Sequence, residues 1–339
     1  MRKLKGYEKL VFIVNSLIAF ALLLSYLLPY LEPKRFAFLS VLSLAVPFLI
    51  IVNLLFVLYW ILKTKKQLFL SFFVLAIGYN YLFSLYKFTA SKNIDDGQNF
   101  SVMNYNVRLF NVFNWIDDPD VKQNISNFIS ENKPDVLCIQ EYRIDSEIKL
   151  NGYHKYEKLH GKKVKNGQAI FTKYPIINSG SIEFPNTFNN AIFADIVRDK
   201  DTIRIYNVHL QSSGINPAAE KLTKENSENL FNRVSTTFKM QQSQAELFLT
   251  HKAQCPYPMI ICGDFNNTAY SYVYKEIKGD LKDAFVEAGN GFGRTYDYKF
   301  FPVRIDFVMV DQGFEVNSFK TYGVKYSDHY PVMAKLKIK

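Results

Sequence analysis

The stretch IICGDFNNT, Ile260–Thr268, decides the fold of the second half of this 339-residue sequence. Four apolar residues, MIIC, run into Gly263 and predict a buried strand. Side chains two residues apart in a strand point to the same face, so Asp264 and Asn266 project together just beyond it. Alone, such an ending is typical of an Asx turn, so a function for it depends on which polar residues end the other strands.

Short apolar runs separated by turn signals continue through the rest of this half. They predict strands at 100–110, 135–141, 167–175, 190–197, 202–210, 258–265, 304–310 and 331–338. Amphipathic periodicity predicts helices at 120–131, 222–253 and 270–278. Many strands with few helices, mixed in order, predict a core of two β-sheets flanked by helices.

Polar side chains also mark most of the other predicted strand ends. The candidates besides Asp264 and Asn266 are Asn106, Glu141, His209, Asp306, Asp328 and His329. Because a buried, unpaired carboxylate is costly, such groups must pair with one another or bind a cation. Oxygen ligands without cysteine favour Mg²⁺, Mn²⁺ or Ca²⁺, and histidine and amide donors suit a phosphoryl group. The set therefore predicts metal-assisted hydrolysis of a phosphate ester.

At these residues the sequence resembles the endonuclease/exonuclease/phosphatase superfamily, whose members include deoxyribonuclease I, inositol phosphatases and neutral sphingomyelinases. The motifs NYNVR, IQE, NVHL, GDFNNT, RIDFVMV and SDHYPV follow one another in this order within residues 100–337. The resemblance implies an α/β (α+β) four-layer sandwich with two central β-sheets, in agreement with the strand pattern. It also implies Mg²⁺ or Mn²⁺ as the cofactor.

The resemblance assigns a metal site and a water site to particular residues. Glu141 is expected to be the principal metal ligand, with Asn106 and Asp328 as further ligands. Asp264 is expected to orient or deprotonate the attacking water. Asn266 is expected to hold the phosphate or the water, a role for which Asn106 is a second candidate.

The resemblance also assigns roles to two histidines. His329 is expected to hydrogen-bond a phosphoryl oxygen in the transition state, while Asp306 orients its imidazole. His209 matches the histidine that family members use as a general acid or a phosphate donor. Because none of these positions is substituted, we expect an active enzyme.

The first 92 residues differ sharply from the rest. The stretches 10–31, 36–62 and 67–86 contain no charged residue. Each has the roughly 20 residues of helix that cross a bilayer core of about 30 Å. We therefore expect a membrane anchor of three transmembrane helices at 1–92, with the lipid bilayer as its partner. A polar linker, 89–99, leads into a catalytic domain at 93–339.

The charge of the chain is concentrated beside the predicted membrane helices. Residues 1–92 hold 11 basic and two acidic residues, which leaves 30 basic and 29 acidic residues from 93 onward. The near-neutral soluble part argues against a broad basic face for nucleic acid. Seven basic residues flank the helices on one side and four on the other, which favours a cytoplasmic N-terminus and an extracytoplasmic catalytic domain in this multi-pass protein.

Three functions stay open on the sequence alone. The first is a membrane-anchored phosphodiesterase acting on nucleic acid, that is, a nuclease. The second is a lipid phosphodiesterase or phosphatase of the sphingomyelinase or inositol phosphatase kind, acting on a lipid headgroup. The third is a non-catalytic membrane scaffold. Family membership alone does not choose among phosphate-ester substrates.

Overall fold

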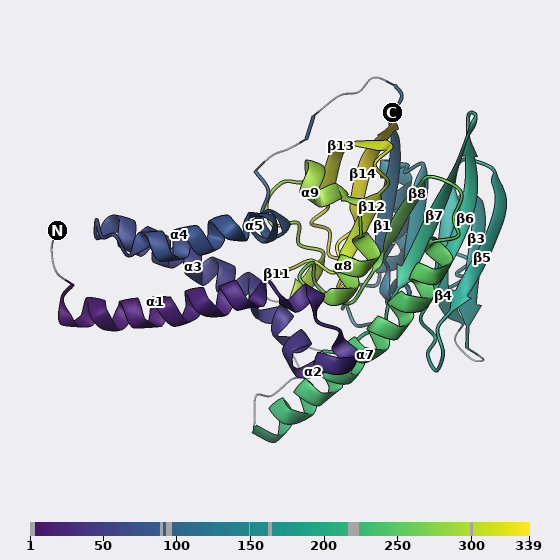
Figure 1. Cartoon of the computed structure of the whole chain (residues 1–339). Helices are drawn as coiled ribbons and strands as arrows, with labels where there is room; N and C mark the ends of the chain where they lie inside the picture. Colours follow the sequence, from purple (N-terminus) through teal and green to yellow (C-terminus); the bar gives the residue numbers. More distant parts are fainter. Residues whose placement is uncertain are drawn as a thin grey trace.

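The computed structural model describes residues 4–88, 91–92, 97–148, 150–161, 165–215, 224–298 and 301–339. Figure 1 shows two parts, a bundle of helices that projects from one end of the molecule and a sandwich of two β-sheets. The sandwich is built from strands between Phe100 and Ile338, as the sequence predicts. The bundle is built from helices between Gly6 and Leu85.

Each sheet has six strands and mixes parallel with antiparallel neighbours. The first has the order β13 (Phe314–Thr321), β14 (Val332–Ile338), β1 (Phe100–Asn106), β2 (Val136–Tyr142), β4 (Asn166–Thr172), β3 (His154–His160). The second has the order β5 (Ile176–Glu183), β6 (Asn190–Arg198), β7 (Asp201–His209), β8 (Met259–Asp264), β12 (Asp306–Val310), β9 (Lys282–Asp283). The pairs β1–β2 and β7–β8 are parallel. A short hairpin, β10 (Tyr296–Tyr298) and β11 (Phe301–Val303), stands apart from both.

The sheets pack face to face, and helices cover their outer faces. Fully buried side chains such as Val102 and Ile260 fill the space between the sheets. The outer face of the first sheet is covered by α6 (Val121–Asn132). The outer face of the second is covered by α7 (Lys224–Lys252) and α8 (Tyr272–Lys278). A fourth helix of this part, α9 (Ala284–Ala288), packs at the edge of the inner core. The predicted sandwich of two flanked sheets is therefore confirmed.

The predicted strands and helices of this part are present with ends shifted by a few residues, while other strands were missed. All eight predicted strands appear, and the three predicted helices correspond to α6, α7 and α8. Positions 222 and 223 of the second predicted helix lie outside the described residues. The missed strands β3 and β5 are largely half-buried or exposed, so they lack a strong apolar pattern. In β13 a register shift between Val316 and Ser318 breaks the alternation.

The bundle begins with two apolar helical segments that are long enough to cross a membrane, 6–30 and 33–62. The first contains α1 (Gly6–Ser25) and the short turn η1 (Leu28–Tyr30). The second is divided by the turn η2 (Leu42–Ala45) into α2 (Pro33–Val41) and α3 (Val46–Leu62). In Figure 1, α2 turns away from the bundle and lies against α7. The predicted second span is thus continuous in sequence but not straight.

The third predicted span, 67–86, is not a single straight helix. It consists of α4 (Leu68–Ile77) and α5 (Tyr79–Leu85), which meet at an angle of 82°. Gly78 lies at the break, and a Cβ there would fall 2.1 Å from the Tyr26 ring. The Tyr26 hydroxyl donates to the carbonyl of Val74 at 3.1 Å. With ten residues, α4 is only about 15 Å long, about half of a bilayer core. The expectation of three transmembrane helices is therefore corrected: the described residues hold two helical segments long and apolar enough to cross a membrane, and one bent pair.

A polar cluster ties the bundle together at its centre. Asn15 donates to the Ser71 hydroxyl at 2.6 Å, and that hydroxyl donates to Asn53 Oδ1 at 2.8 Å. The Trp60 indole donates to Asn15 Oδ1 at 2.8 Å. All four side chains are fully buried. Each of these three bonds joins two different helices. These groups therefore act in helix packing.

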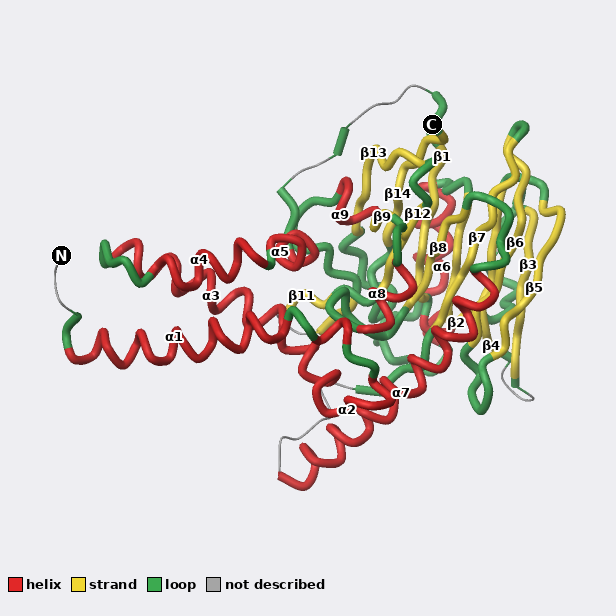
Figure 2. The backbone as a smooth tube through the Cα atoms, in the orientation of Figure 1, coloured by secondary structure: helices red, strands yellow, loops and turns green. Residues whose placement is uncertain are grey.

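The bundle is docked on the sandwich by direct contacts (Figure 2). The backbones of Lys87 and Gly291 exchange two hydrogen bonds of 2.8 Å. The Tyr270 hydroxyl donates to the carbonyl of Tyr81 at 3.2 Å, and the two rings stack with centroids 6.0 Å apart. The backbone N–H of Lys34 donates to Gln242 on α7 at 2.8 Å. These contacts give the helices a defined position against the domain.

Candidate active site at the strand ends

Three adjacent strands of the second sheet bring ionisable side chains to one edge. In the register of β7 and β8, His209 lies opposite Asp264. In the register of β8 and β12, Asp306 lies opposite Asp264 on the other side. Asp264 is therefore the central residue of this edge. Gly263 permits the close packing of these strands, because a Cβ there would lie 2.1 Å from the Val208 carbonyl oxygen.

An Asx turn holds the Asp264 carboxylate in place. The backbone N–H of Asn266 donates to Asp264 Oδ1 at 2.8 Å, and Asn266 adopts the left-handed φ of 49° that asparagine tolerates. The Asn266 amide donates to the carbonyl of Leu210 at 2.9 Å. The Asx turn that is typical of such a strand ending is therefore present at Asp264–Asn266. It also leaves Asp264 Oδ2 directed toward the rest of the site.

The facing sheet contributes Asn106 from the end of β1. Its Nδ2 donates across the gap between the sheets to Asp264 Oδ2 at 3.0 Å, and within its own sheet to Glu141 Oε1 at 3.3 Å. Its Oδ1 accepts from the backbone N–H of Arg108 at 3.0 Å. Because a backbone N–H can only donate, this bond fixes which end of the amide faces the carboxylates. Asn106 is thus a donor to both carboxylates, an arrangement that suits positioning better than metal ligation.

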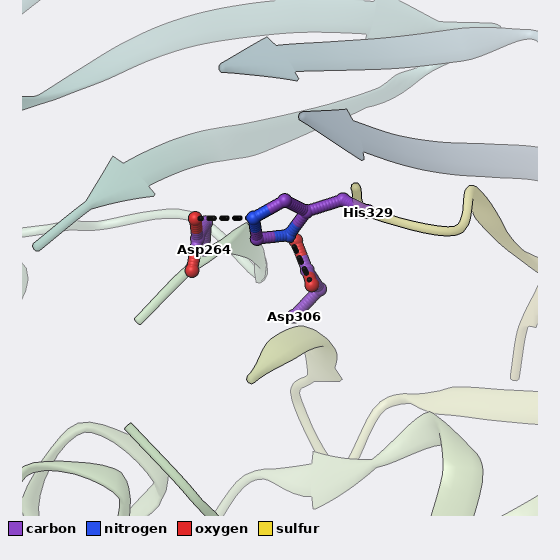
Figure 3. Close-up of side chains that lie close together, drawn as sticks. All are labelled: Asp264, Asp306 and His329. Atoms are coloured by element: carbon purple, nitrogen blue, oxygen red, sulfur yellow. Dashed lines mark hydrogen bonds and ion pairs between the residues drawn. The ribbon is translucent and has the colours of Figure 1, made fainter. Parts of the chain in front are cut away.

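His329 lies between the two aspartates of the second sheet (Figure 3). Its Nδ1 is 2.9 Å from Asp306 Oδ2, and its Nε2 is 3.6 Å from Asp264 Oδ2. Thr295 supports this arrangement, because its hydroxyl accepts from the backbone N–H of Asp306 at 3.1 Å and its carbonyl accepts from that of Tyr330 at 2.7 Å. The aspartate expected to orient the imidazole therefore lies at hydrogen-bonding distance from it.

The burial and charges of this cluster shift its pKa values strongly. Burial acts to lower the pKa of His329, but the carboxylates of Asp306 and Asp264 outweigh it and raise this pKa to about 10. Burial raises the pKa of Asp264 to about 7, against the opposing effect of His329 and with a further contribution from Asp306. His329 is therefore a cation at neutral pH, and Asp264 titrates near neutrality. Shifts of this size at converging groups are typical of functional sites.

His209 is the second histidine of the site and has the opposite electrostatics. Its Nε2 lies 3.8 Å from Asp264 Oδ2. Burial, followed by the positive charge of His329, lowers the pKa of His209 to about 3. His209 is therefore neutral at pH 7. A neutral imidazole can donate one hydrogen bond but is a poor source of a proton.

Glu141 and Asp328 place carboxylates at the open side of the cluster. Glu141 has a left-handed φ of 49°, and the β2–β4 register shifts around it, between Gln140 and Tyr142. Burial raises the pKa of Glu141 above its ordinary value, against the opposing positive charge of His329. Asp328 Oδ2 lies 3.3 Å from Arg108 Nη1. These oxygen donors fit a hard divalent cation such as Mg²⁺ or Mn²⁺.

A second group with metal-ligand spacing is formed by Asp264, Asp306 and His329. Their ligand atoms lie within 4.8 Å of one another, and all three residues are buried. Both ring nitrogens of His329 face carboxylates, however, and its raised pKa keeps both protonated. A protonated imidazole has no free lone pair for a metal. The trio is therefore better explained as a chain in which His329 is hydrogen-bonded to Asp306 and ion-paired with Asp264 than as a metal site.

A layer of buried amides supports the site from below. Gln140 Nε2 donates to Asn104 Oδ1 at 2.6 Å and to Asn207 Oδ1 at 2.5 Å. Asn207 donates in turn to the carbonyl of Ile139 at 2.9 Å. These bonds link both sheets directly beneath the strand ends. They therefore fix the distance between Glu141 on one sheet and Asp264 on the other.

A cavity of about 270 Å³ opens at these residues. Its lining includes Glu141, Asn266, Asp328 and His329 from the predicted site. Three further lining or supporting residues were not predicted, namely Thr295, Tyr296 and Asn267. The ring of Tyr296 lies 5.0 Å from that of His329. Thr295 and Tyr296 lie outside the predicted strands and motifs, so the sequence carries no signal that would assign them to the site, whereas Asn267 belongs to the motif GDFNNT and was not singled out there.

The chain belongs to the Endonuclease/Exonuclease/phosphatase family, whose model matches residues 103–329. This match contains every predicted site residue. A separate domain of unknown function (DUF8431) matches residues 8–85, which cover the helical bundle. No curated protein matches the chain.

Solved structures share the sandwich fold at low sequence identity. An endonuclease/exonuclease/phosphatase from Bacteroides vulgatus is 19% identical, with a TM-score of 0.55, and the match covers 71% of this chain and 99% of that one. The catalytic domain of human Nocturnin with a bound sulfate anion is 18% identical, with a TM-score of 0.53 and coverage of 72% and 94%. D. rerio TDP2 complexed with a single-strand DNA product is 15% identical, with a TM-score of 0.53 and coverage of 70% and 99%.

Proposed function

We propose that this protein hydrolyses phosphate esters with the help of a divalent metal ion, Mg²⁺ or Mn²⁺. The observation that carries the proposal is the chain Asp264–His329–Asp306 beside Glu141, at one open edge of the two sheets. It combines a carboxylate that titrates near neutrality, a cationic hydrogen-bond donor and a carboxylate fit for a metal. Family membership supports this assignment.

The proposed reaction divides the work among these residues. Glu141, with Asp328, would hold the metal ion, which supplies Lewis-acid stabilisation of charge on the phosphoryl oxygens. Asp264 Oδ2 accepts a hydrogen bond from the attacking water and takes its proton, which a pKa of about 7 permits. His329 donates to a phosphoryl oxygen. Asp306 orients the His329 ring and stabilises its positive charge.

The remaining predicted residues have supporting roles in this proposal. Asn106 donates to Asp264 and Glu141, and so fixes the distance between the water site and the metal site. Asn266 holds Asp264 through its backbone N–H. Because His209 is neutral, it serves as a hydrogen-bond donor to phosphate instead of a general acid.

The helical bundle supports a proposal of membrane anchoring. Its first two segments are long and apolar enough to cross a bilayer. Many of its large apolar side chains are exposed, including Leu17, Phe20, Leu58 and Phe73. The start of α1 lies at the end of the bundle that is remote from the sheets (Figure 1). If the bundle crosses the membrane, its N-terminus and the catalytic domain lie on opposite sides, as the charged flanks predict.

A nucleic-acid substrate is one candidate within this function. It is favoured by the fold shared with TDP2, which was solved with a single-strand DNA product. The near-neutral charge of the sandwich opposes it. The general test of the proposed function is hydrolysis of bis-p-nitrophenyl phosphate by the full chain in detergent, with Mg²⁺ or Mn²⁺ and with EDTA. Release of p-nitrophenolate that EDTA abolishes is expected, and its absence with every divalent metal would refute the proposal.

A further inference from the structure

The cavity at the active site has one wall made by the helical bundle. Leu44 comes from η2 and Pro47 from the start of α3, and Ser84 and Leu85 come from the end of α5. The same cavity reaches Glu141 among the site residues. An anchor that only tethered the enzyme would not need to touch the substrate cavity. Here the anchor and the catalytic edge line one space.

The lining between these two ends is mostly apolar and aromatic, with Ser212, Ser213 and Thr268 among its polar members. It includes Phe238 on α7, Phe292 and the β10–β11 hairpin. Arg304 is the one Lys or Arg side chain among the described residues that line the cavity, and it is paired with Asp283 at 2.7 Å. A nucleic-acid strand carries a charge at every nucleotide and is held by free cations and basic grooves. This cavity suits a ligand with one phosphate and an apolar body.

The bend between α4 and α5 creates the bundle side of this wall. Because the two helices meet at 82°, α5 leaves the bundle direction and reaches the domain. Ser84 and Leu85 at its end then border the cavity, and the Ser84 carbonyl lies 3.4 Å from Arg304 Nη2. The buried Tyr270 joins the apolar core of the bundle itself. The wall is therefore part of a packed interface.

We propose that the substrate is an amphipathic phosphate ester drawn from the bilayer, with its phosphate beside Glu141 and His329 and its apolar chain against Leu44, Leu85 and Phe292. This inference rests on the proposed function and names the substrate class of the same site. In the reaction, the water oxygen bonds to phosphorus and gives one proton to Asp264, the ester P–O bond breaks, and the leaving alkoxide takes up a proton from solvent water. The apolar chain stays in the cavity or returns to the membrane.

The test uses the full chain in nanodiscs with three kinds of substrate. These are soluble bis-p-nitrophenyl phosphate, two lipids (phosphatidylglycerol as a diester and phosphatidic acid as a monoester) and plasmid DNA. The variant Leu44→Trp fills the apolar end of the cavity, away from the catalytic groups. Its matched control is Leu54→Trp, at an exposed residue of α3 outside the cavity lining. A second pair is Phe292→Ala with Phe188→Ala, both at exposed phenylalanines.

The expected result is hydrolysis of at least one lipid by the wild type. Leu44→Trp and Phe292→Ala are expected to lower kcat/KM for that lipid by about tenfold or more, in the range of shape discrimination by an apolar pocket. For bis-p-nitrophenyl phosphate, which has no apolar chain, the two cavity variants are expected to lose much less activity than for the lipid. Both control variants are expected to keep wild-type activity toward every substrate. The bis-p-nitrophenyl phosphate activity also reports whether each variant is folded.

The contradicting results separate the inference from the function beneath it. Hydrolysis of bis-p-nitrophenyl phosphate or plasmid DNA without hydrolysis of either lipid would overturn the lipid substrate and leave the phosphoesterase standing. Lipid hydrolysis that neither cavity variant alters would overturn the assigned path of the apolar chain. No hydrolysis of any substrate would overturn the proposed function together with this inference.

Discussion

The protein buries two polar clusters, one in the helical bundle and one at the strand ends, and they differ in charge. The bundle cluster joins Asn15, Asn53, Trp60 and Ser71, which are all neutral. The strand-end cluster contains carboxylates and imidazoles whose pKa values are shifted far from their ordinary values. The first cluster is closed inside the helices, whereas the second borders a cavity.

This difference shows which buried polar groups indicate chemistry. A neutral network whose donors meet acceptors stabilises packing and needs no ligand. Burying ionisable groups close together beside a cavity costs free energy, and a bound cation or substrate can offset that cost. The comparison therefore predicts that changes in the two clusters have separable effects, on turnover in one case and on stability in the other.

The largest effect on turnover is expected for Asp264→Asn. The amide keeps the shape of the side chain but cannot take the proton of the attacking water, so kcat should fall by about 10² to 10⁴-fold. The measurement is metal-dependent hydrolysis of bis-p-nitrophenyl phosphate by the full chain. The thermal unfolding midpoint is expected to stay close to that of the wild type. A variant with more than a tenth of wild-type kcat would remove Asp264 from the chemistry.

A somewhat smaller loss is expected for Glu141→Gln, through the metal site. Replacing the carboxylate removes a charged ligand, so both activity and Mn²⁺ affinity should fall by at least about tenfold. Titration calorimetry with Mn²⁺ measures the affinity, and activity is followed over a range of metal concentrations. Unchanged Mn²⁺ affinity in this variant would place the metal elsewhere.

A shift in pH dependence is expected for Asp306→Asn. Activity needs protonated His329, whose pKa is raised to about 10, so wild-type kcat should fall only as the pH rises through that region. The Asp306 charge raises the pKa of His329 and burial lowers it, so removing that charge lowers the pKa. The alkaline limb of the pH–kcat profile should therefore move to lower pH. If the limb does not move, Asp306 does not control the charge of His329.

The smallest effect on turnover is expected for Asn15→Leu in the bundle cluster. This change leaves the Trp60 indole N–H without its acceptor, at about 1 to 3 kcal/mol for the unsatisfied group, while the Ser71 hydroxyl keeps its bond to Asn53. The thermal unfolding midpoint of the full chain in detergent should fall. Activity per folded molecule should match the wild type, and a selective loss of kcat would mean that the two clusters are coupled.

The sequence predicted the sandwich and the clustering of polar strand ends because both depend on short local patterns. An apolar run ending in Asp264 or Glu141 shows a strand and its edge together. The exposed edge strand β3 and the support from Thr295 lack such a pattern. The roles of single residues as metal ligand, proton acceptor or hydrogen-bond donor could be named only by resemblance to a family. They depend on distances between the two sheets, which spacing along the sequence does not give.

The bend at Gly78 shows a different limit. Hydropathy counts apolar residues but does not register that the Tyr26 ring occupies the space of a side chain at that position. The break is a tertiary effect between segments 52 residues apart, so a window along the chain predicts one straight span. That same bend directs α5 toward the cavity, so the missed feature bears on function.

The most direct test of the central claim compares the wild type with Asp264→Asn in hydrolysis of bis-p-nitrophenyl phosphate, using the full chain in detergent with Mg²⁺ or Mn²⁺. The account predicts p-nitrophenolate release by the wild type, its loss in EDTA, and its near-complete loss in the variant at an unchanged unfolding midpoint. Equal release by the two proteins, or none by a folded wild type with any divalent metal, would contradict it.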